Sequence, residues 1–145
     1  MTKIFCDIAD INTIKKYSKK KIVKGFTTNP SLMRKAGAKD YIKYARQILK
    51  SANNKPVSLE VFADDYFKIV QQALVLNSLN KNVYVKIPVT NSNGIFMGRV
   101  IRELNERKIK LNITAVYTSS QTKRILSCIK KRSKVIISIF AGRMA

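Results

Sequence analysis

The chain has 145 residues, a formal net charge of +21 and a hydrophobic share of 46%. This length suits one domain, and the apolar share is enough for a packed core, which excludes an intrinsically disordered chain. No apolar run approaches the ~18 residues of a membrane span, and the N-terminus lacks the apolar region of a signal peptide, so we expect a cytoplasmic protein with no membrane partner.

Six short apolar runs, most of them rich in valine and isoleucine, predict buried β-strands. They lie at residues 3–8, 25–27, 57–61, 83–87, 111–115 and 135–139. Between them, apolar residues recur with the spacing of helices that cover one face of a sheet. These helices are expected at residues 41–49, 64–79, 94–107 and 119–131. In the second of them the apolar stripe is Phe67, Val70, Ala73 and Leu74.

The alternation of strands and helices predicts an α/β fold with a parallel sheet. A doubly wound sheet and a barrel are both compatible with this order. No glycine-rich loop follows the first strand and no Walker motif is present, which disfavours the nucleotide-binding layout. The strand starts recur about every 26 residues, as in a barrel. We therefore expect residues 1–145 to form one incomplete domain, about the first six units of a parallel (β/α)8 TIM barrel.

The chain contains no histidine and only two cysteines, Cys6 and Cys128. This excludes Ser-His-Asp and Cys-His catalysis and removes the commonest metal ligand. Two distant cysteines do not form a zinc-binding pattern, so we expect no metal site and two reduced, buried thiols.

The positive charge is compatible either with a nucleic-acid-binding protein or with solvated, lysine-rich helix faces. The basic residues are spread over several predicted helices and loops, and the chain has no tryptophan and no RNA-binding aromatic motif. We therefore expect solvated faces and do not expect nucleic acid as a partner.

Polar side chains stand at the carboxyl ends of the predicted strands, where the catalytic residues of barrel enzymes lie. They are Asp7, Thr28 and Asn29, Glu60, Lys86, Asn112 and Thr114, Ser138, and Arg143 just beyond the last strand. Burying an unpaired polar group costs several kcal/mol, so polar residues in apolar strands indicate a site. Asn29 also suits a helix N-cap, with Pro30 in the first helical position, so a structural role is equally open.

Lys86 is the most informative of these residues, because lysine is almost never fully buried without a partner. Burial favours the neutral amine, which is a nucleophile toward carbonyl groups. The alternative is a structural ion pair with Glu60 or Asp7, or a side chain that reaches solvent. Asp7 and Glu60 could in turn be general acid/base groups or could simply balance the lysine. Arg143 could bind a phosphate or remain solvated.

Taken together, six segments resemble the transaldolase family of class I aldolases. They are FCDIA at 5–9, GFTTNPS at 25–31, VSLEV at 57–61, VKIP at 85–88, LNIT at 111–114 and ISIFAGR at 137–143. They occur in the order of the family and cover essentially the whole chain. The resemblance implies a barrel enzyme of the pentose phosphate pathway that transfers a dihydroxyacetone unit from a ketose phosphate to an aldose phosphate.

The resemblance also implies a role for each matching residue. Lys86 would form the Schiff base, Asp7 would take the proton of the substrate hydroxyl, and Glu60 with Thr114 would hold a proton-shuttling water. Thr28, Asn29, Asn112 and Ser138 would bind the sugar, and Arg143 its phosphate. The iminium would act as the electron sink, so no cofactor is expected.

The fructose-6-phosphate aldolase subgroup usually has Gln where Glu60 stands and Tyr where Phe140 stands, which favours a transaldolase here. The last two barrel units of the family are absent, and with them part of the phosphate site and of the subunit contacts. We expect a homo-oligomer at full length and an inactive or poorly soluble product from the 145 residues alone. Another Schiff-base aldolase, or a basic nucleic-acid-binding module, remains the alternative.

Overall fold

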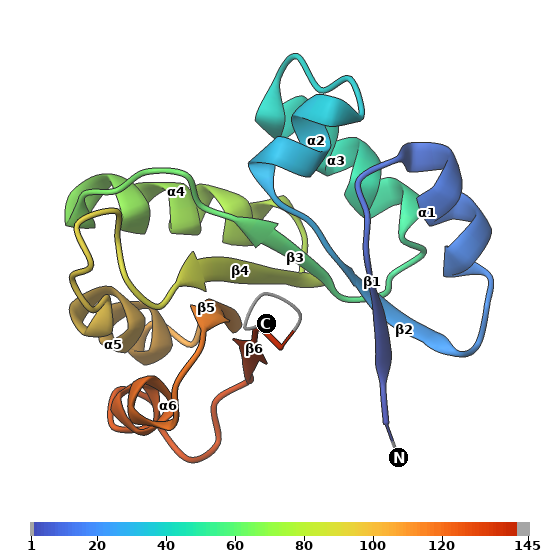
Figure 1. The fold of residues 1–145 in the computed structure, drawn as a ribbon. Coiled ribbons are helices and arrows are strands. Elements are labelled where there is room, and N and C mark those ends of the chain that lie inside the picture. The colour runs from blue at the N-terminus through green and yellow to red at the C-terminus, as the bar shows by residue number, and fades with distance from the viewer. Residues whose placement is uncertain (1, 142–145) are drawn as a thin grey trace.

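The computed structural model describes residues 2–141, which form six parallel strands alternating with helices (Figure 1). The elements in chain order are β1 (Ile4–Asp7), α1 (Ile11–Ser18), β2 (Val23–Thr27), α2 (Pro30–Lys35), α3 (Tyr41–Ser51), β3 (Val57–Glu60), α4 (Tyr66–Leu79), β4 (Val83–Pro88), α5 (Gly98–Glu106), β5 (Leu111–Val116), α6 (Ser119–Leu126) and β6 (Val135–Ile139).

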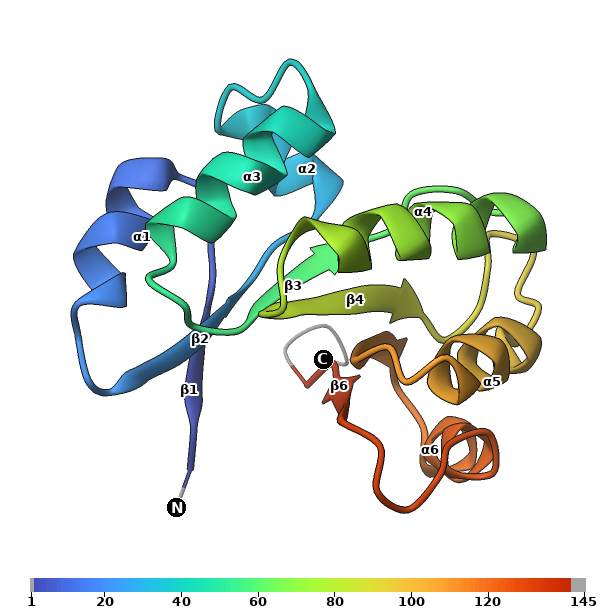
Figure 2. The same ribbon diagram turned by 180° about the vertical axis from the view of Figure 1, so that it is seen from behind.

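The strands form one sheet in the order β1-β2-β3-β4-β5-β6, and every neighbouring pair is parallel. The sheet is curled, its helices lie along its outer side, and β1 and β6 are its two edges (Figures 1 and 2). This arrangement confirms the predicted partial parallel (β/α)8 barrel. Because all six strands run the same way, their carboxyl ends meet at one end of the sheet.

Helix starts follow local sequence signals. Side-chain caps precede α1, α2, α3, α4 and α6, and the capping residues are Asp10, Asn29, Asp40, Asp65 and Thr118. Each accepts a hydrogen bond from a backbone N–H in the first turn of its helix, which satisfies one of the donors left free there. The prediction of a helix that starts after Asn29, with Pro30 in its first turn, is confirmed.

Some element boundaries differ from the prediction. Helix α1 was not predicted, although Ile14 is fully buried and Asp10 supplies a cap. Helix α5 begins at Gly98 rather than residue 94, because Thr90 and Phe96 pair as a short antiparallel bridge before it. Helix α6 ends at Leu126, before the predicted residue 131. Short helices and bridges of this kind leave little periodicity in a sequence.

The core lies between the sheet and the helices and includes Val100, Ile101 and Leu104 of α5. The stripe predicted for α4 is partly wrong. Phe67 is 72% exposed and Leu74 is 38% exposed, whereas Ile69 and Leu76 are buried beside Val70 and Ala73. Helix α4 is apolar on most of its surface, so its sequence does not define which face meets the sheet.

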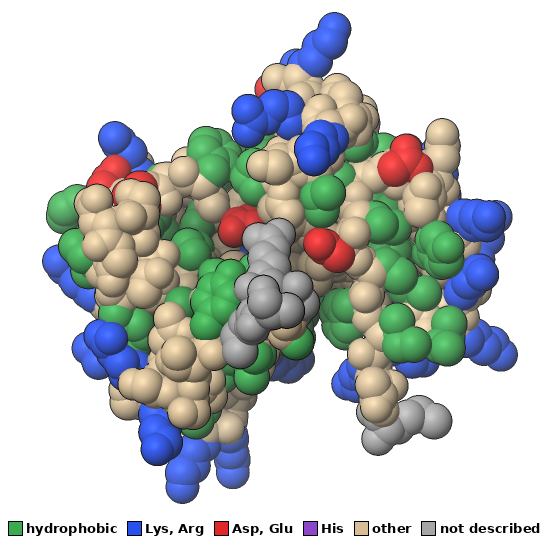
Figure 3. Space-filling model, in the orientation of Figure 1, with side chains coloured by type: hydrophobic (Ala, Val, Ile, Leu, Met, Phe, Trp, Pro, Cys, Tyr) green, Lys and Arg blue, Asp and Glu red, His purple; other side chains and the backbone are tan. Residues whose placement is uncertain are grey.

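Basic side chains dominate the charged surface seen in Figure 3, and the two cysteines differ in burial. Lys and Arg side chains are scattered around the periphery of the face seen in Figure 3, while a few acidic side chains lie near its middle. Cys128 is buried as expected, but Cys6 is only partly buried because β1 is an edge strand. Among the described residues, no helix is long and apolar enough to cross a membrane.

Candidate active site

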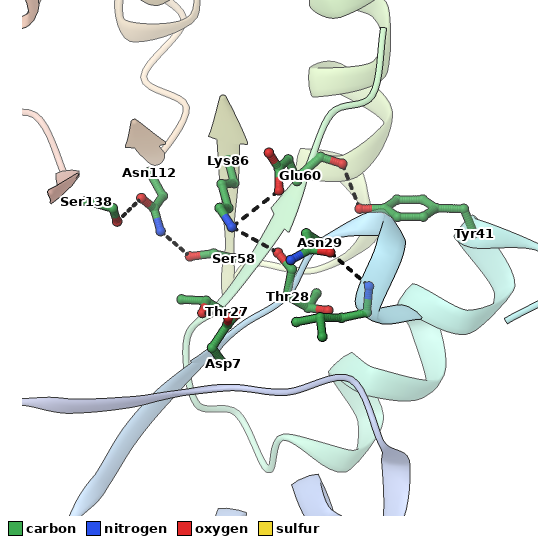
Figure 4. A network of polar contacts seen from close by, with 11 residues as sticks. Asp7, Thr27, Thr28, Asn29, Tyr41, Ser58, Glu60, Lys86, Asn112 and Ser138 are labelled. Carbon is green, nitrogen blue, oxygen red and sulfur yellow. Dashed lines mark hydrogen bonds and ion pairs between the residues drawn. The ribbon is translucent and has the colours of Figure 1, made fainter. Parts of the chain in front are cut away.

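The carboxyl ends of the strands bring together several of the polar side chains singled out in the sequence (Figure 4). Glu60 in β3 is the register partner of Lys86 in β4, and Lys86 is in turn the partner of Asn112 in β5. Paired residues of parallel neighbours point to the same side of a sheet. The three side chains therefore form one row on the concave side.

Lys86 is buried, with 7% of its surface exposed. Its Nζ lies 3.3 Å from Oε2 of Glu60 and donates a hydrogen bond of 3.4 Å to the main-chain carbonyl of Thr28. Both β3 and β5 flank β4, so the stem of the lysine is enclosed by neighbouring strands. Lys86 is thus buried and paired with the carboxylate of Glu60. This is the ion pair that the sequence offered as the alternative to a nucleophilic lysine, and the two roles are compatible.

Glu60 has an environment that disfavours its ionised form. Burial raises the pKa of the Glu60 carboxyl above its usual value; the Lys86 ammonium opposes this shift, and the charge of Asp7 adds to it. A carboxyl whose pKa is displaced toward neutrality can exchange protons more readily near physiological pH. Glu60 is therefore suited to acid/base chemistry beside Lys86.

Tyr41 in α3 supports the end of β3 and was not predicted from the sequence. Its hydroxyl donates a hydrogen bond of 2.7 Å to the main-chain carbonyl of Glu60. Burial raises the pKa of the Tyr41 phenol, and the nearby charge of Glu60 adds to that shift. The phenol therefore remains a protonated donor that fixes the backbone of Glu60.

Side-chain hydrogen bonds near Lys86 also link residues of β3, β5 and β6. Nδ2 of Asn112 donates to Oγ of Ser58 at 3.0 Å, and Oγ of Ser138 donates to Oδ1 of Asn112 at 2.7 Å (Figure 4). Ser58 was not among the predicted site residues. The sequence feature that could have identified it is its polar side chain inside an apolar strand. Ser58 stands two positions before Glu60 and therefore points to the same side of the sheet.

Thr114 and Thr28 have buried hydroxyl groups that lack a hydrogen-bond partner among the residues described. A buried hydroxyl without a partner is costly and rare, so it indicates an interaction supplied by a ligand or water. Ala115, which follows Thr114, has a positive φ of 57°, and the pairing of β5 with β6 is irregular at this point. Such bulges and left-handed residues redirect side chains and concentrate at functional sites.

Asp7 and Asn29 have partners of their own. Thr27 Oγ1 donates a hydrogen bond of 2.8 Å to Asp7 Oδ1, and Asp7 is exposed at the end of the edge strand β1. The side chain of Asn29 accepts from the backbone N–H of Leu32 at 2.8 Å. Asn29 thus caps α2, as one reading of the sequence predicted, and also lines the cavity beside Lys86.

A cavity of about 490 Å³ opens at this end of the sheet. It is lined by Asn29, Pro30, Ser31, Glu60, Val61, Phe62, Lys86, Thr114, Ala115, Tyr117 and Phe140. Four predicted site residues therefore share the cavity wall, whereas Asp7, Thr28, Asn112 and Ser138 lie around it without lining it. Arg143 lies outside the described residues.

The chemistry available at this cavity is that of an amine beside a carboxyl. Within residues 2–141, no three Asp, Glu or Cys side chains are grouped so that they could hold a metal ion. Polar groups, by contrast, converge on Lys86 from β2, β3 and β5. A lysine enclosed in this way, next to a proton-exchanging carboxyl, can add to a carbonyl group.

Sequence comparisons agree with this geometry. The family described as Transaldolase/Fructose-6-phosphate aldolase matches residues 4–145. A "Probable transaldolase" of Carboxydothermus hydrogenoformans is 36% identical over 97% of this chain and 61% of its own length. Proteins with the same description from Methanococcus maripaludis and a Thermoanaerobacter species are 33% and 31% identical over 98% of this chain.

The chain spans about 61% of the length of these relatives. The family match covers nearly every residue, and both the partial barrel and the row of polar strand ends are present. The chain belongs to the transaldolase/fructose-6-phosphate aldolase family.

Proposed function

We propose that this chain is the part of a transaldolase that forms a Schiff base through Lys86. The observation that carries the proposal is the position of the Lys86 amine, buried and 3.3 Å from the Glu60 carboxyl at the wall of a cavity. The donor would be fructose 6-phosphate or sedoheptulose 7-phosphate, and the acceptor an aldose phosphate. The reaction belongs to the pentose phosphate pathway, and a cytoplasmic location is part of the proposal.

In the first step, the Lys86 ammonium passes a proton to the Glu60 carboxylate, and the resulting amine adds to the C2 carbonyl of the ketose. Loss of water from the resulting carbinolamine gives an iminium ion. Glu60 and the hydroxyl of Thr114 hold the water that exchanges protons in this step. The buried, unpartnered hydroxyl of Thr114 and the raised pKa of Glu60 support these two roles.

In the second step, the C3–C4 bond breaks and its electron pair passes to the iminium, which becomes an enamine. The C4 hydroxyl loses its proton to Asp7, and the aldose phosphate leaves. The enamine then attacks the aldehyde of the acceptor, the proton returns from Asp7, and hydrolysis frees Lys86. The electron sink is the lysine iminium itself, so this proposal requires no cofactor.

Substrate binding is assigned to the residues around the lysine. Asn29 lines the cavity and could contact the substrate directly. Asn112 and Ser138 would give up the hydrogen bond between them and bind substrate hydroxyls instead. The buried hydroxyl of Thr28 lacks a partner among the described residues, and the substrate would have to displace its neighbours or bind through water to reach it. Arg143 would bind the phosphate group.

Two cavity residues favour group transfer over simple aldol cleavage. Glu60 stands where fructose-6-phosphate aldolases usually have Gln, and Phe140 stands where they usually have Tyr. Phe140 contacts Tyr117 edge to face, with ring centroids 5.6 Å apart, and both rings line the cavity. Phe140 itself carries no phenol that could protonate the enamine from this position.

Acceptor dependence tests this assignment. The protein to assay is a chimera in which the part of the Carboxydothermus hydrogenoformans relative that this chain leaves uncovered follows residue 145. With fructose 6-phosphate as donor, we expect turnover only when an aldose phosphate is added. Lys86→Met should lower turnover by about 10⁴-fold or more, because it removes the nucleophile. Release of dihydroxyacetone without an acceptor, at the same rate, would assign the chain to the aldolases instead.

A further inference from the structure

A second cavity lies at the opposite end of the strands, where β5 and β6 begin. Its volume is about 480 Å³. It is lined by Asn105, Glu106, Lys108, Ile109, Lys110, Lys130, Arg132, Ser133 and Lys134. Five of these side chains are cationic and one is acidic. This composition differs from that of the cavity beside Lys86, where one lysine faces one glutamate.

Two of the five cations are held side by side by the sheet. Lys110 and Lys134 immediately precede the register partners Leu111 and Val135, and the N–H of Leu111 donates to the carbonyl of Lys134 at 3.1 Å. Like charges at neighbouring positions of adjacent strands are destabilising. Burial lowers the pKa of Lys110, and the charge of Lys134 lowers it further.

The side chain of Lys110 reaches toward β4, on the side of β5 away from β6 and Lys134. Its ammonium donates a hydrogen bond to the main-chain carbonyl of Lys81 and lies 5.3 Å from the centroid of the Tyr84 ring. The side chain is therefore fixed at the cavity wall. Between residues 2 and 141, the ion pairs involve Lys68, Lys86 and Arg107, and none involves a cation of this cavity. The five cations of the cavity therefore outnumber its one carboxylate, Glu106, and no ion pair joins them within the described residues.

The walls of the cavity are tied together by Asn105, which is only 3% exposed. Its Oδ1 accepts hydrogen bonds of 3.0 Å from the N–H of Lys130 and from Oγ of Ser133. These bonds fasten the loop before β6 to the end of α5. Nδ2 of Asn105 is buried and lacks a hydrogen-bond partner in the described part of the chain, which leaves a donor unsatisfied beside the cavity lining.

Lys108 has an unusual backbone conformation at the rim of the cavity. Its φ is 60°, and its N–H donates to the carbonyl of Asn105 at the end of α5. Glycine is the usual residue at this position of a helix end, because other residues are strained there. A strained residue kept at a cavity rim indicates a role for its side chain.

We propose that this cavity binds a compact oligophosphate anion, one with two or more linked phosphoryl groups. Five cations against one carboxylate exceed what a single phosphate neutralises, and lysine and arginine are the usual ligands of phosphoryl oxygens. The limited volume of the cavity and the hydrogen bonds that fasten its walls favour a small anion over a long strand. The site is separate from the cavity beside Lys86 and does not depend on the function proposed for it.

Calorimetric titration of the chimera defined above with sodium tripolyphosphate, at about 150 mM NaCl to suppress diffuse attraction, tests the proposal. We expect one saturable site per chain. Lys110→Gln/Lys134→Gln should weaken binding by about tenfold or more. Lys16→Gln/Lys43→Gln, which removes the same charge from exposed positions on α1 and α3, should change it less than about twofold. Equal losses in the two double variants, or no saturable binding by the unsubstituted chimera, would overturn the proposal.

A second variant separates loss of binding from loss of fold. Lys108→Gly removes one cation of the cavity and relieves the left-handed backbone, so the melting temperature should rise while tripolyphosphate binding weakens. A variant with a raised melting temperature and unchanged binding would contradict the role of Lys108 and the proposed site.

Two competition arms identify the ligand class. Adenosine triphosphate should compete with tripolyphosphate, because the phosphate chain is what the cavity recognises, and sodium sulfate at equal ionic strength should not. A single-stranded oligonucleotide that binds more tightly than tripolyphosphate and displaces it would assign the surface to nucleic acid and overturn the proposal.

Discussion

Acidic residues are scarce in this chain, with eight against 29 basic residues, and most of them have an identifiable structural partner. Asp10, Asp40 and Asp65 cap helices. Asp64 accepts from Ser92, and Glu103 pairs with Arg107. Asp7 and Glu60 stand apart from these, because both lie at strand carboxyl ends on the side of the sheet that holds Lys86. Each also has a local partner, Thr27 for Asp7 and Lys86 for Glu60.

Glu60→Gln tests whether burial or the Lys86 ion pair dominates at this position. Because folding raises the pKa of Glu60 above its ordinary value of 4.5, the folded chain binds this proton more tightly than the unfolded chain does. The resulting stability is fully present below the unfolded pKa and is lost as the pH rises through the folded pKa. We therefore expect the variant to melt at a higher temperature than the wild type at about pH 7.5, with the difference closing below about pH 4.5.

Thermal unfolding over this pH range provides the measurement, with Asp40→Ala as a control that removes a helix cap and should only destabilise. A Glu60→Gln variant that melts lower than the wild type at neutral pH would show that the attraction to Lys86 outweighs the cost of burial. The expected combination, a gain in stability with a loss of turnover, is typical of residues kept for function.

The positions of single residues could be inferred best where strand and place in the strand were both defined. Lys86, Glu60 and Thr114 stand in long apolar runs, so their strand and the end at which they lie could be inferred. Tyr41 and Ser58 were not predicted, because their partners are a backbone carbonyl and an amide on other elements. Contacts of that kind depend on strand register, which apolar patterning does not define at single-residue precision.

At the scale of elements, β5 shapes the candidate site through an irregularity. Between Ile113 and Val116 the pairing with β6 shifts by one residue, and Ala115 adopts a left-handed conformation there. The segment reads as an ordinary strand in the sequence, since nothing in the residues LNITAV indicates a bulge. Tertiary pairing imposed a conformation that local propensity does not favour.

Substitutions at Ala115 test the strain in this bulge. Ala115→Gly should raise the free energy of unfolding by about 0.5–1 kcal/mol, because glycine adopts positive φ without steric cost. Ala115→Val should lower it by about 1–3 kcal/mol, because a β-branched side chain clashes in this conformation. Urea denaturation of the two variants and the wild type measures both effects. The reverse order of stabilities would show that the bulge is not maintained in solution.

At the scale of the molecule, the fold class and strand order followed from the alternation and spacing of apolar runs. The face that α4 buries did not, because that helix is apolar on most sides. The sheet has two edges, β1 and β6, and their hydrophobic residues Ile4 and Ile139 are 43% and 63% exposed. Unpaired strand edges of this kind favour association with other chains.

The 145-residue chain alone should therefore associate nonspecifically and lack transaldolase turnover, whereas the chimera that adds the uncovered part of a relative should form a defined oligomer. Size-exclusion chromatography with light scattering at several protein concentrations distinguishes the two behaviours. A soluble monomer of the 145 residues with normal turnover would refute this prediction.

Borohydride reduction in the presence of fructose 6-phosphate, followed by peptide mass mapping, measures the proposed covalent step most directly. In the chimera, the reduced three-carbon adduct should lie on the peptide that contains Lys86 and should be absent from the Lys86→Met variant. An adduct on a different lysine, or no adduct in a chimera that is folded and binds the sugar phosphate, would contradict the assignment of Lys86 as the Schiff-base residue.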